Sequence, residues 1–287
     1  MAETYNTLYL DARRALREAG ADAPQLEAQE LLRFASGKTR EELYRDMPLY
    51  PGEEIARRFS ALLARRLAGE PVAYLLGEWE FYGLPLDICP DVLIPRDDTE
   101  VLARQAILRA QETAGEARVL DLCAGSGCVG LAVAAQCPDA RVMLGDVSEA
   151  ALRVCRQNIR RNGLSGRVTT FQLDVREKPS AALWDFDVIA SNPPYIPTGD
   201  LASLDVSVRD YEPHLALDGG ADGLDFYRAI TEKWLARLRP GGYLICEVGM
   251  GQAGAVEHLF ARHGLRDIQT YADTNQIWRV VEGRLDG

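Results

Sequence analysis

Residues 119–135, VLDLCAGSGCVGLAVAA, combine an apolar run, a turn of small residues and a second apolar run. This pattern predicts a strand, a tight turn and a helix. Gly125 and Gly127 allow the backbone of the turn to approach a ligand closely, and the helix that follows offers free N–H groups in its first turn. The stretch is typical of a loop that binds a nucleotide-type cofactor.

Asp146 follows about 20 residues later, at the end of the next strand-like run, where such folds place an acid that accepts hydrogen bonds from both ribose hydroxyls. The loop alone does not identify the cofactor. Gly125, Gly127 and Gly130 satisfy the dinucleotide pattern GxGxxG, which favours a hydride-transfer enzyme. Together with Asp121 the same turn reads DxxxGxG, which suits S-adenosylmethionine. Both interpretations stay open at this point.

A second stretch, FDVIASNPPYIP at residues 186–197, ends an apolar strand-like run at Asn192. Sheet pairing stops there because proline donates no backbone N–H and pushes the residue before it away from helical dihedrals. The sequence therefore predicts a stiff, extended loop. In isolation such a loop is only a turn after a buried strand, so its neighbours decide whether it does more.

From about Asp97 onward, strand-like and helix-like runs alternate, which predicts an α/β domain with a parallel sheet covered on both faces. We expect the strands at ARVLDL, ARVMLGD, VTTFQLD, FDVIAS and GYLICEVG, with two short strands after HGL. A doubly wound sheet lays three strands outward and then returns to place the fourth beside the first. The loops CAGSG and SNPPY are therefore expected side by side, and we interpret the stiff loop as a substrate clamp.

The first part of the chain has a different pattern. Residues 3 to about 70 carry apolar residues at helical spacing in four segments, punctuated by Gly and Pro. Residues 78–95 then alternate, carry aromatics and turn at Gly83, as a β-hairpin does. The sequence predicts a helical docking domain over 1–72, a β-hairpin linker over 73–96 and a catalytic domain over 97–287.

The composition of the whole chain limits the classes of partner that we expect it to bind. The 287 residues carry a net charge of −11, which opposes adherence to a phosphate backbone. The six cysteines include no CxxC pair and the three histidines are not grouped with them, so we expect no metal site. We find neither the apolar core of a signal peptide nor a bilayer-spanning apolar run. We expect a soluble, cytoplasmic protein with no membrane and no direct nucleic-acid partner.

The Asn-Pro-Pro-Tyr loop after the fourth strand resembles that of the amino-methyltransferases that use S-adenosylmethionine. These enzymes modify nitrogens conjugated to a π system: adenine N6, cytosine N4 and the side-chain amide of glutamine. The resemblance implies that the Asn192 side-chain oxygen and the Pro193 carbonyl accept the two N–H bonds of the target, while Tyr195 packs on its plane. The prolines, Pro194 included, hold these acceptors stiffly, so orientation supplies most of the catalytic effect.

Further stretches are similar to one family, the peptide chain release factor glutamine methyltransferases. They are AGEPVAYLLGEWEFYGLPLDICPDVLIPRDDTE (68–100), VRDYEPHLALDGGADGLDFYRAI (208–230) and LRPGGYLICEVGMGQ (238–252). The resemblance implies a doubly wound, Rossmann-like methyltransferase sheet of seven strands, the last antiparallel. It implies methyl transfer to N5 of the glutamine in the Gly-Gly-Gln motif of class I release factors, and a helical domain that grips the release factor.

Carried over by position, the resemblance places S-adenosyl-L-methionine, and its product S-adenosyl-L-homocysteine, against Cys123, Ala124, Gly125, Ser126, Gly127, Asp146, Val175 and Asn192. It places the substrate glutamine against Asn192, Pro193, Pro194 and Tyr195. Arg96 and Glu100 belong to the signature Ile-Pro-Arg-x-x-Thr-Glu, either as an ion pair that braces the pocket entrance or as ligand contacts.

Several positions depart from the family pattern, among them Asp97 in place of a proline and a glycine missing from ADTNQIWRVVEGR near the C-terminus, and two further ones concern the cofactor site. Cys123 stands where many relatives have a glycine, which is harmless if this residue keeps φ negative. Val175 replaces a frequent aromatic that would stack on adenine, so we expect weaker cofactor binding.

Four alternatives remain. A ribosomal-protein glutamine methyltransferase shares the NPPY loop but carries a different sequence at the Arg96 to Glu100 signature. An adenine-N6 nucleic-acid methyltransferase needs a basic channel and base flipping, which the acidic balance opposes. A nicotinamide-dependent oxidoreductase explains the glycine loop but gives the proline loop no role. A non-catalytic binding module conflicts with the intact Asp146, Asn192 and Tyr195.

Overall fold

The structure, a computed structural model, describes residues 3–181, 183 and 185–286. It divides into two compact units, one made of residues 1–77 and 206–211 and the other of residues 78–205 and 212–287. Each unit has its own hydrophobic core. Within the described part of the chain, no helix is both long and apolar enough to cross a bilayer.

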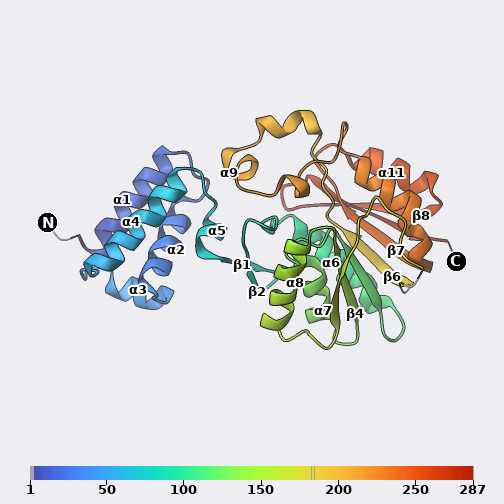
Figure 1. Cartoon of the computed structure of the whole chain (residues 1–287), viewed down its shortest axis with the longest axis horizontal. Coiled ribbons are helices and arrows are strands. Elements are labelled where there is room, and N and C mark those ends of the chain that lie inside the picture. The colour runs from blue at the N-terminus through green and yellow to red at the C-terminus, as the bar shows by residue number, and fades with distance from the viewer. Residues whose placement is uncertain (1–2, 182, 184, 287) are drawn as a thin grey trace. The chain divides into compact units, whose positions relative to one another are not determined.

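The helical unit contains α1 (Tyr5–Glu18), α2 (Pro24–Ser36), α3 (Arg40–Asp46), α4 (Glu53–Leu67), α5 (Val72–Leu76) and the short α9 (Val206–Arg209) (Figure 1). Thr4 caps α1, and Thr39 with Glu42 forms a capping box at the start of α3. Leucines and alanines at helical spacing on α1 and α2 pack in one core with Phe59. The helices predicted between residues 3 and 70 are confirmed.

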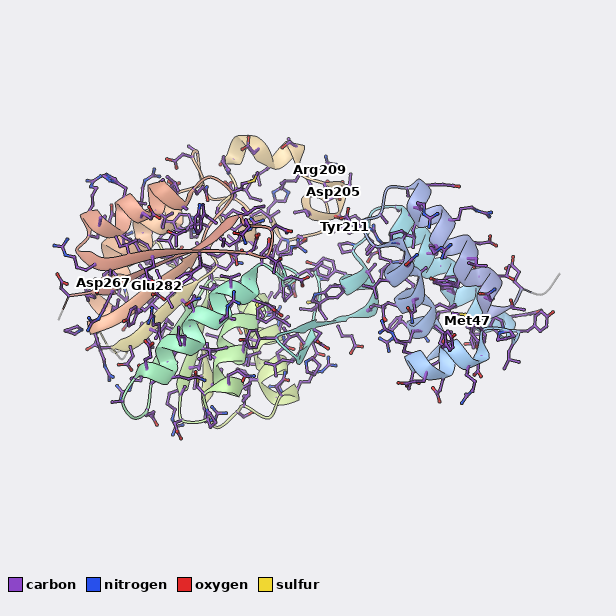
Figure 2. All side chains as sticks on the ribbon, turned by 180° about the vertical axis from the view of Figure 1, so that it is seen from behind. Met47, Asp205, Arg209, Tyr211, Asp267 and Glu282 are labelled. Carbon is purple, nitrogen blue, oxygen red and sulfur yellow. The ribbon has the colours of Figure 1, made fainter. Side chains whose placement is uncertain are left out.

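Residues 206–211 join the helical unit although they lie far along the chain, which the sequence did not predict. The Tyr211 hydroxyl donates to the carbonyl of Ala68 at 3.3 Å (Tyr211 is labelled in Figure 2). Gly69 allows Val206 to come close, because a Cβ at Gly69 would lie 2.9 Å from Val206 Cγ1.

The predicted hairpin is formed by β1 (Glu78–Phe81) and β2 (Leu84–Asp87), which pair antiparallel. Tyr82 and Gly83 between them have φ of 53° and 76°, the pair of positive values that a type I′ turn requires. Asn158 holds β2 by accepting from the Asp87 N–H at 2.6 Å and donating to the Asp87 carbonyl at 3.2 Å. The hairpin therefore belongs to the unit that carries the large sheet.

In that unit the described residues form a seven-stranded sheet with the order β5-β4-β3-β6-β7-β9-β8. The strands are β3 (Arg118–Leu122), β4 (Arg141–Asp146), β5 (Val168–Gln172), β6 (Phe186–Ser191), β7 (Leu238–Glu247), β8 (Leu265–Ala272) and β9 (Trp278–Leu285). Neighbours from β5 to β7 pair in parallel, whereas β9 runs antiparallel to both β7 and β8. The strand order reverses between β3 and β6, so the doubly wound fold with an antiparallel last strand is confirmed.

Helices cover both faces of the sheet (Figure 1). One face carries α6 (Thr99–Glu112), α7 (Cys128–Gln136) and α8 (Glu149–Arg161). The other carries α11 (Ala253–Arg262) and α10 (Asp225–Ala229), which continues as a π-helix (Ile230–Trp234) and a short 3₁₀ helix (Leu235–Arg237). Gly130 explains how closely α7 packs on β4, because a Cβ there would lie 2.3 Å from Leu144 Cδ2. Short 3₁₀ turns at Thr198–Ser203 and His214–Ala216 complete the unit.

Candidate functional site

The carboxyl ends of β3, β4 and β6 open onto one cavity of about 1010 Å³, a volume that includes its open mouth. Doubly wound sheets bind ligands at this edge. Of the residues that the sequence predicted for the site, Cys123, Ala124, Gly125, Ser126, Asp146, Val175, Asn192 and Pro194 line the cavity. Gly127, Pro193 and Tyr195 lie next to these residues in the chain but outside the lining.

The two predicted loops leave the sheet from adjacent positions. Leu122 at the end of β3 pairs with Ser191 at the end of β6. The Ser191 hydroxyl donates to the Leu122 carbonyl at 2.9 Å, which fastens the two strand ends to each other. The glycine loop and the Asn-Pro-Pro-Tyr loop therefore border the same cavity, and the prediction that they lie side by side is confirmed.

Asp146 organises the glycine loop. Its Oδ2 accepts from the Gly125 N–H and its Oδ1 from the Ser148 N–H, both at 2.9 Å. Burial raises the pKa of Asp146, and these N–H groups oppose the rise. A carboxylate oxygen accepts more than one hydrogen bond, so both oxygens retain capacity for the two hydroxyls of a ribose.

The cavity fits S-adenosylmethionine, whose bound form supplies an electrophilic methyl group. A Cβ on Gly125 would meet nothing within 4 Å, so the space above the loop is open to a ligand. Leu173, Val175 and Phe226 give the same cavity an apolar wall suited to a purine. Phe226 was missed as a site residue, because only its place in the 208–230 stretch hinted at it; its ring adds the aromatic surface that Val175 lacks.

Cys123 corrects one expectation from the sequence. Its φ is +59°, in the left-handed region, so the condition of a negative φ is not met. A side chain at this position is therefore strained, as the glycine of many relatives would not be.

The strain can be measured with two variants that both remove the thiol. We expect Cys123→Gly to be more stable than Cys123→Ala by about 1 kcal/mol, because only alanine keeps a Cβ in the left-handed region. Urea unfolding of the two purified variants gives the difference directly. Equal midpoints, or a more stable alanine variant, would show that the turn is not strained.

The cysteines near the site do not form a metal centre. Among the described residues, no group of three or more His, Cys, Asp or Glu side chains is placed to hold an ion. Burial raises the pKa of the Cys123, Cys128 and Cys155 thiols. Protonated thiols of this kind act as small apolar side chains rather than as nucleophiles or ligands.

The Asn-Pro-Pro-Tyr loop is fixed by more than its prolines. Ile196 donates its N–H to the Leu217 carbonyl at 3.0 Å and accepts from the Gly219 N–H at 2.8 Å. The Gln252 side chain donates to the Tyr195 carbonyl at 2.9 Å. A Cβ on Gly249 would lie 3.0 Å from the Tyr195 ring, so the ring packs directly on this backbone. The sequence indicated the stiffness but not these anchors.

Arg96 and Glu100 take different partners. Arg96 lines the cavity and forms an ion pair with Glu212, a buried carboxylate that also accepts from the Ile94 N–H at 3.2 Å. Glu100 accepts from the Tyr82 N–H at 3.3 Å in the hairpin turn. One alternative from the sequence was an ion pair that braces the pocket entrance. Arg96 does form an ion pair at the cavity wall, but its partner is Glu212 rather than Glu100, and nothing in the sequence marked Glu212 for this role.

Comparisons with known proteins identify the family of this chain. Residues 7–77 match the PrmC N-terminal domain and residues 99–207 match the methyltransferase small domain. The release factor glutamine methyltransferase of Geobacter sulfurreducens is 46% identical over 94% of this chain and 93% of its own. The one from Moorella thermoacetica is 42% identical over 87% of each chain.

A solved methyltransferase from Pyrococcus furiosus is 18% identical and shares the fold, with a TM-score of 0.52 over 79% of this chain and 100% of its own. The identity and coverage of the two release factor enzymes settle the family. The chain belongs to the release factor glutamine methyltransferases, a family of S-adenosylmethionine-dependent enzymes.

Proposed function

We propose that this enzyme transfers the methyl group of S-adenosyl-L-methionine to the side-chain amide nitrogen, N5, of the glutamine in the Gly-Gly-Gln motif of class I peptide chain release factors. S-adenosyl-L-homocysteine is the other product. One observation carries the proposal: Asn192, which directly follows β6, lines the same cavity as the loop that fits the cofactor. The identity with release factor methyltransferases supports the choice of substrate.

In this proposal the protein orients the amide rather than deprotonating it first, and the nitrogen releases one proton to solvent as the C–S bond breaks and the C–N bond forms. The Asn192 Nδ2 atom donates to Thr99 Oγ1 at 3.3 Å, so Oδ1 remains as an acceptor. Oδ1 and the Pro193 carbonyl accept the two N–H bonds of the substrate amide and aim its nitrogen at the cavity. The anchored loop keeps both acceptors in place, which lowers the barrier through orientation.

Tyr195 and Pro194 complete the proposed substrate site. Pro194 lines the cavity, whereas Tyr195 is half-buried and packs on Gly249. Contact between the Tyr195 ring and the amide plane therefore requires the substrate to reach past Pro194. Burial raises the pKa of Tyr195 to about 12, so its hydroxyl stays protonated and does not act as a base.

The class I release factor is the proposed protein partner. In this proposal residues 73–96 are the linker, residues 97–287 are the methyltransferase domain, and the release factor docks onto the helical domain, residues 1–72. Its match to the PrmC N-terminal domain supports a role specific to this family. The net charge of −11 supports a protein substrate over a nucleic acid. Because release factors act on cytoplasmic ribosomes, we propose that the reaction takes place in the cytoplasm.

Labelled S-adenosylmethionine tests the proposal. Incubated with the purified enzyme, a class I release factor should gain label, and a factor whose Gly-Gly-Gln glutamine is changed to alanine should gain none. A ribosomal protein and an adenine-containing duplex serve as competing acceptors. Label that persists on the glutamine-free factor, or that prefers either competing acceptor, would refute the assigned substrate.

A further inference from the structure

Glu247, the last residue of β7, is a buried carboxyl group that the mechanism above does not use. It is 3% exposed. Its Oε2 has no hydrogen-bond partner among the residues that the structure describes. A buried carboxyl with incomplete hydrogen bonding destabilises a fold, so its presence at this place calls for a reason other than stability.

The position of Glu247 supplies that reason. Cys246 pairs with Ser191, so Glu247 and Asn192 are the next residues on two neighbouring strand ends. Thr99, at the start of α6, and Asn192 both lie near the Glu247 carboxyl, and both side chains lower its pKa. Asn192 Nδ2 in turn lies 3.3 Å from Thr99 Oγ1. Glu247, Thr99 and Asn192 thus form one cluster beside the cavity, which we call the amide-holding cluster.

We propose that Glu247 is a positioning residue for methyl transfer: its carboxylate, together with Thr99, holds the NH₂ group of Asn192 and thereby leaves Oδ1 as the acceptor for the substrate amide. The inference rests on the proposed function, because it assigns a cause to the orientation of Asn192. An ionised carboxylate has no donor, so it can bind only the NH₂ end of the Asn192 amide. A protonated carboxyl group carries an O–H donor that can bind Oδ1 instead and reverse the amide.

The protonation state of Glu247 is therefore part of the mechanism. Burial raises the pKa of Glu247 to about 7, and the polar side chain of Thr99, the charge of Arg279 and the polar side chain of Asn192 oppose the rise. The Glu247 carboxyl interacts electrostatically with charged or titratable groups on the elements around it. They are Asp98 before α6, Cys128 on α7, Tyr195 after β6, Tyr227 on α10 and Arg279 on β9. Arg279 is itself paired with Asp98 at 2.8 Å and with Asp273 at 3.0 Å.

The test is the dependence of kcat on pH, with the release factor saturating, for the wild type and Glu247→Gln. We expect the wild-type kcat to rise as pH rises through about 7, where the carboxylate forms. Glutamine does not titrate and can offer either end to Asn192, so the variant should lose this rise and fall about tenfold below the wild type at pH 8. Its affinity for S-adenosylmethionine, measured by calorimetry, should not change.

Two further variants make the result specific. Thr99→Val removes a donor that favours the ionised form, so the midpoint of the kcat rise should move to higher pH. Glu282→Gln changes another buried glutamate, which binds Arg109 in the last turn of α6, whereas Thr99 begins that helix. This variant should leave the pH midpoint of kcat unchanged. A midpoint that stays fixed in Thr99→Val, or moves in Glu282→Gln, would contradict the assignment.

Thermal unfolding separates positioning from a structural role. The folded-state pKa of Glu247 lies above that of the unfolded chain, so the wild type loses stability as pH rises from about 4.5 to about 7. Glu247→Gln removes this loss, and its Tm should exceed that of the wild type at pH 8 while the two converge near pH 4.5. A structural residue would lower Tm and activity together.

The outcomes also distinguish the two proposals. If the wild type labels no release factor, the proposed function fails and this inference fails with it. If the wild type labels the factor while Glu247→Gln keeps the wild-type kcat and pH midpoint, only the positioning role is wrong.

Discussion

Asn192→Ala should lower kcat by about 10² to 10³, because it removes the side-chain acceptor that orients the substrate amide only on the way to transfer. Cofactor affinity should change far less, since Asp146 and the glycine loop carry most of the polar contacts predicted for the ribose. The KM for the release factor should also change little, because we propose that the helical domain makes most of the docking contacts. Steady-state kinetics with labelled cofactor and calorimetry of cofactor binding give these three quantities.

The chain offers a matched control for this variant. Asn275 lies exposed in the loop between β8 and β9, and its substitution by alanine should leave kcat unchanged. Asn192→Ala with near wild-type kcat would refute the orienting role, and the positioning role of Glu247 would lose its target. A loss confined to cofactor affinity would place Asn192 at the cofactor rather than at the substrate.

The fold could be predicted because its signals are local and repeated. Helical spacing over residues 3–70, alternation around Gly83 and the regular exchange of strand and helix after Asp97 each rest on which side chains face a core. The place of the two loops followed from topology, since parallel strands that enter a doubly wound sheet in this order must bring their carboxyl ends together. Register and burial were not needed for that step.

The rest depended on contacts between residues far apart in sequence. Arg96 and Glu212 are separated by more than a hundred positions, and nothing local to either marks the other as its partner. The same holds for Glu247 with Thr99, and for Phe226 in the cavity wall. The positive φ of Cys123 was missed for a different reason, because a cysteine carries no sign in the sequence that its backbone enters the left-handed region, as a glycine would.

A buried ion pair between Arg109 and Glu282 stabilises the fold near the end of α6, remote from the amide-holding cluster. Arg109 on α6 binds Glu282 on β9 through two hydrogen bonds, of 2.6 and 3.1 Å (Glu282 is labelled in Figure 2). Glu282 is 1% exposed, and Arg109 also lies over the Tyr243 ring at 4.4 Å. The hydrogen bond to Glu282 raises the pKa of Arg109, so the guanidinium stays charged and the pair joins the helix to the sheet.

We expect Arg109→Met to lower the free energy of unfolding by about 3 to 5 kcal/mol, because it removes a full positive charge beside the buried Glu282 carboxylate. Among the described residues, the Tyr271 hydroxyl at 3.3 Å is then the one side-chain donor left to this carboxylate. Urea unfolding followed by circular dichroism measures the loss. Methyl transfer per folded molecule should stay near the wild-type value, since neither residue lines the cavity.

The double variant Arg109→Met with Glu282→Leu decides whether this loss comes from an orphaned charge or from lost packing. Two apolar side chains of similar volume remove the buried charge as well as its partner, and such replacements of buried ion pairs are often neutral or stabilising. We therefore expect the double variant to recover most of the stability that Arg109→Met loses. If it is no more stable than the single variant, the contact of Arg109 with the Tyr243 ring, rather than the ion pair, holds α6 against the sheet.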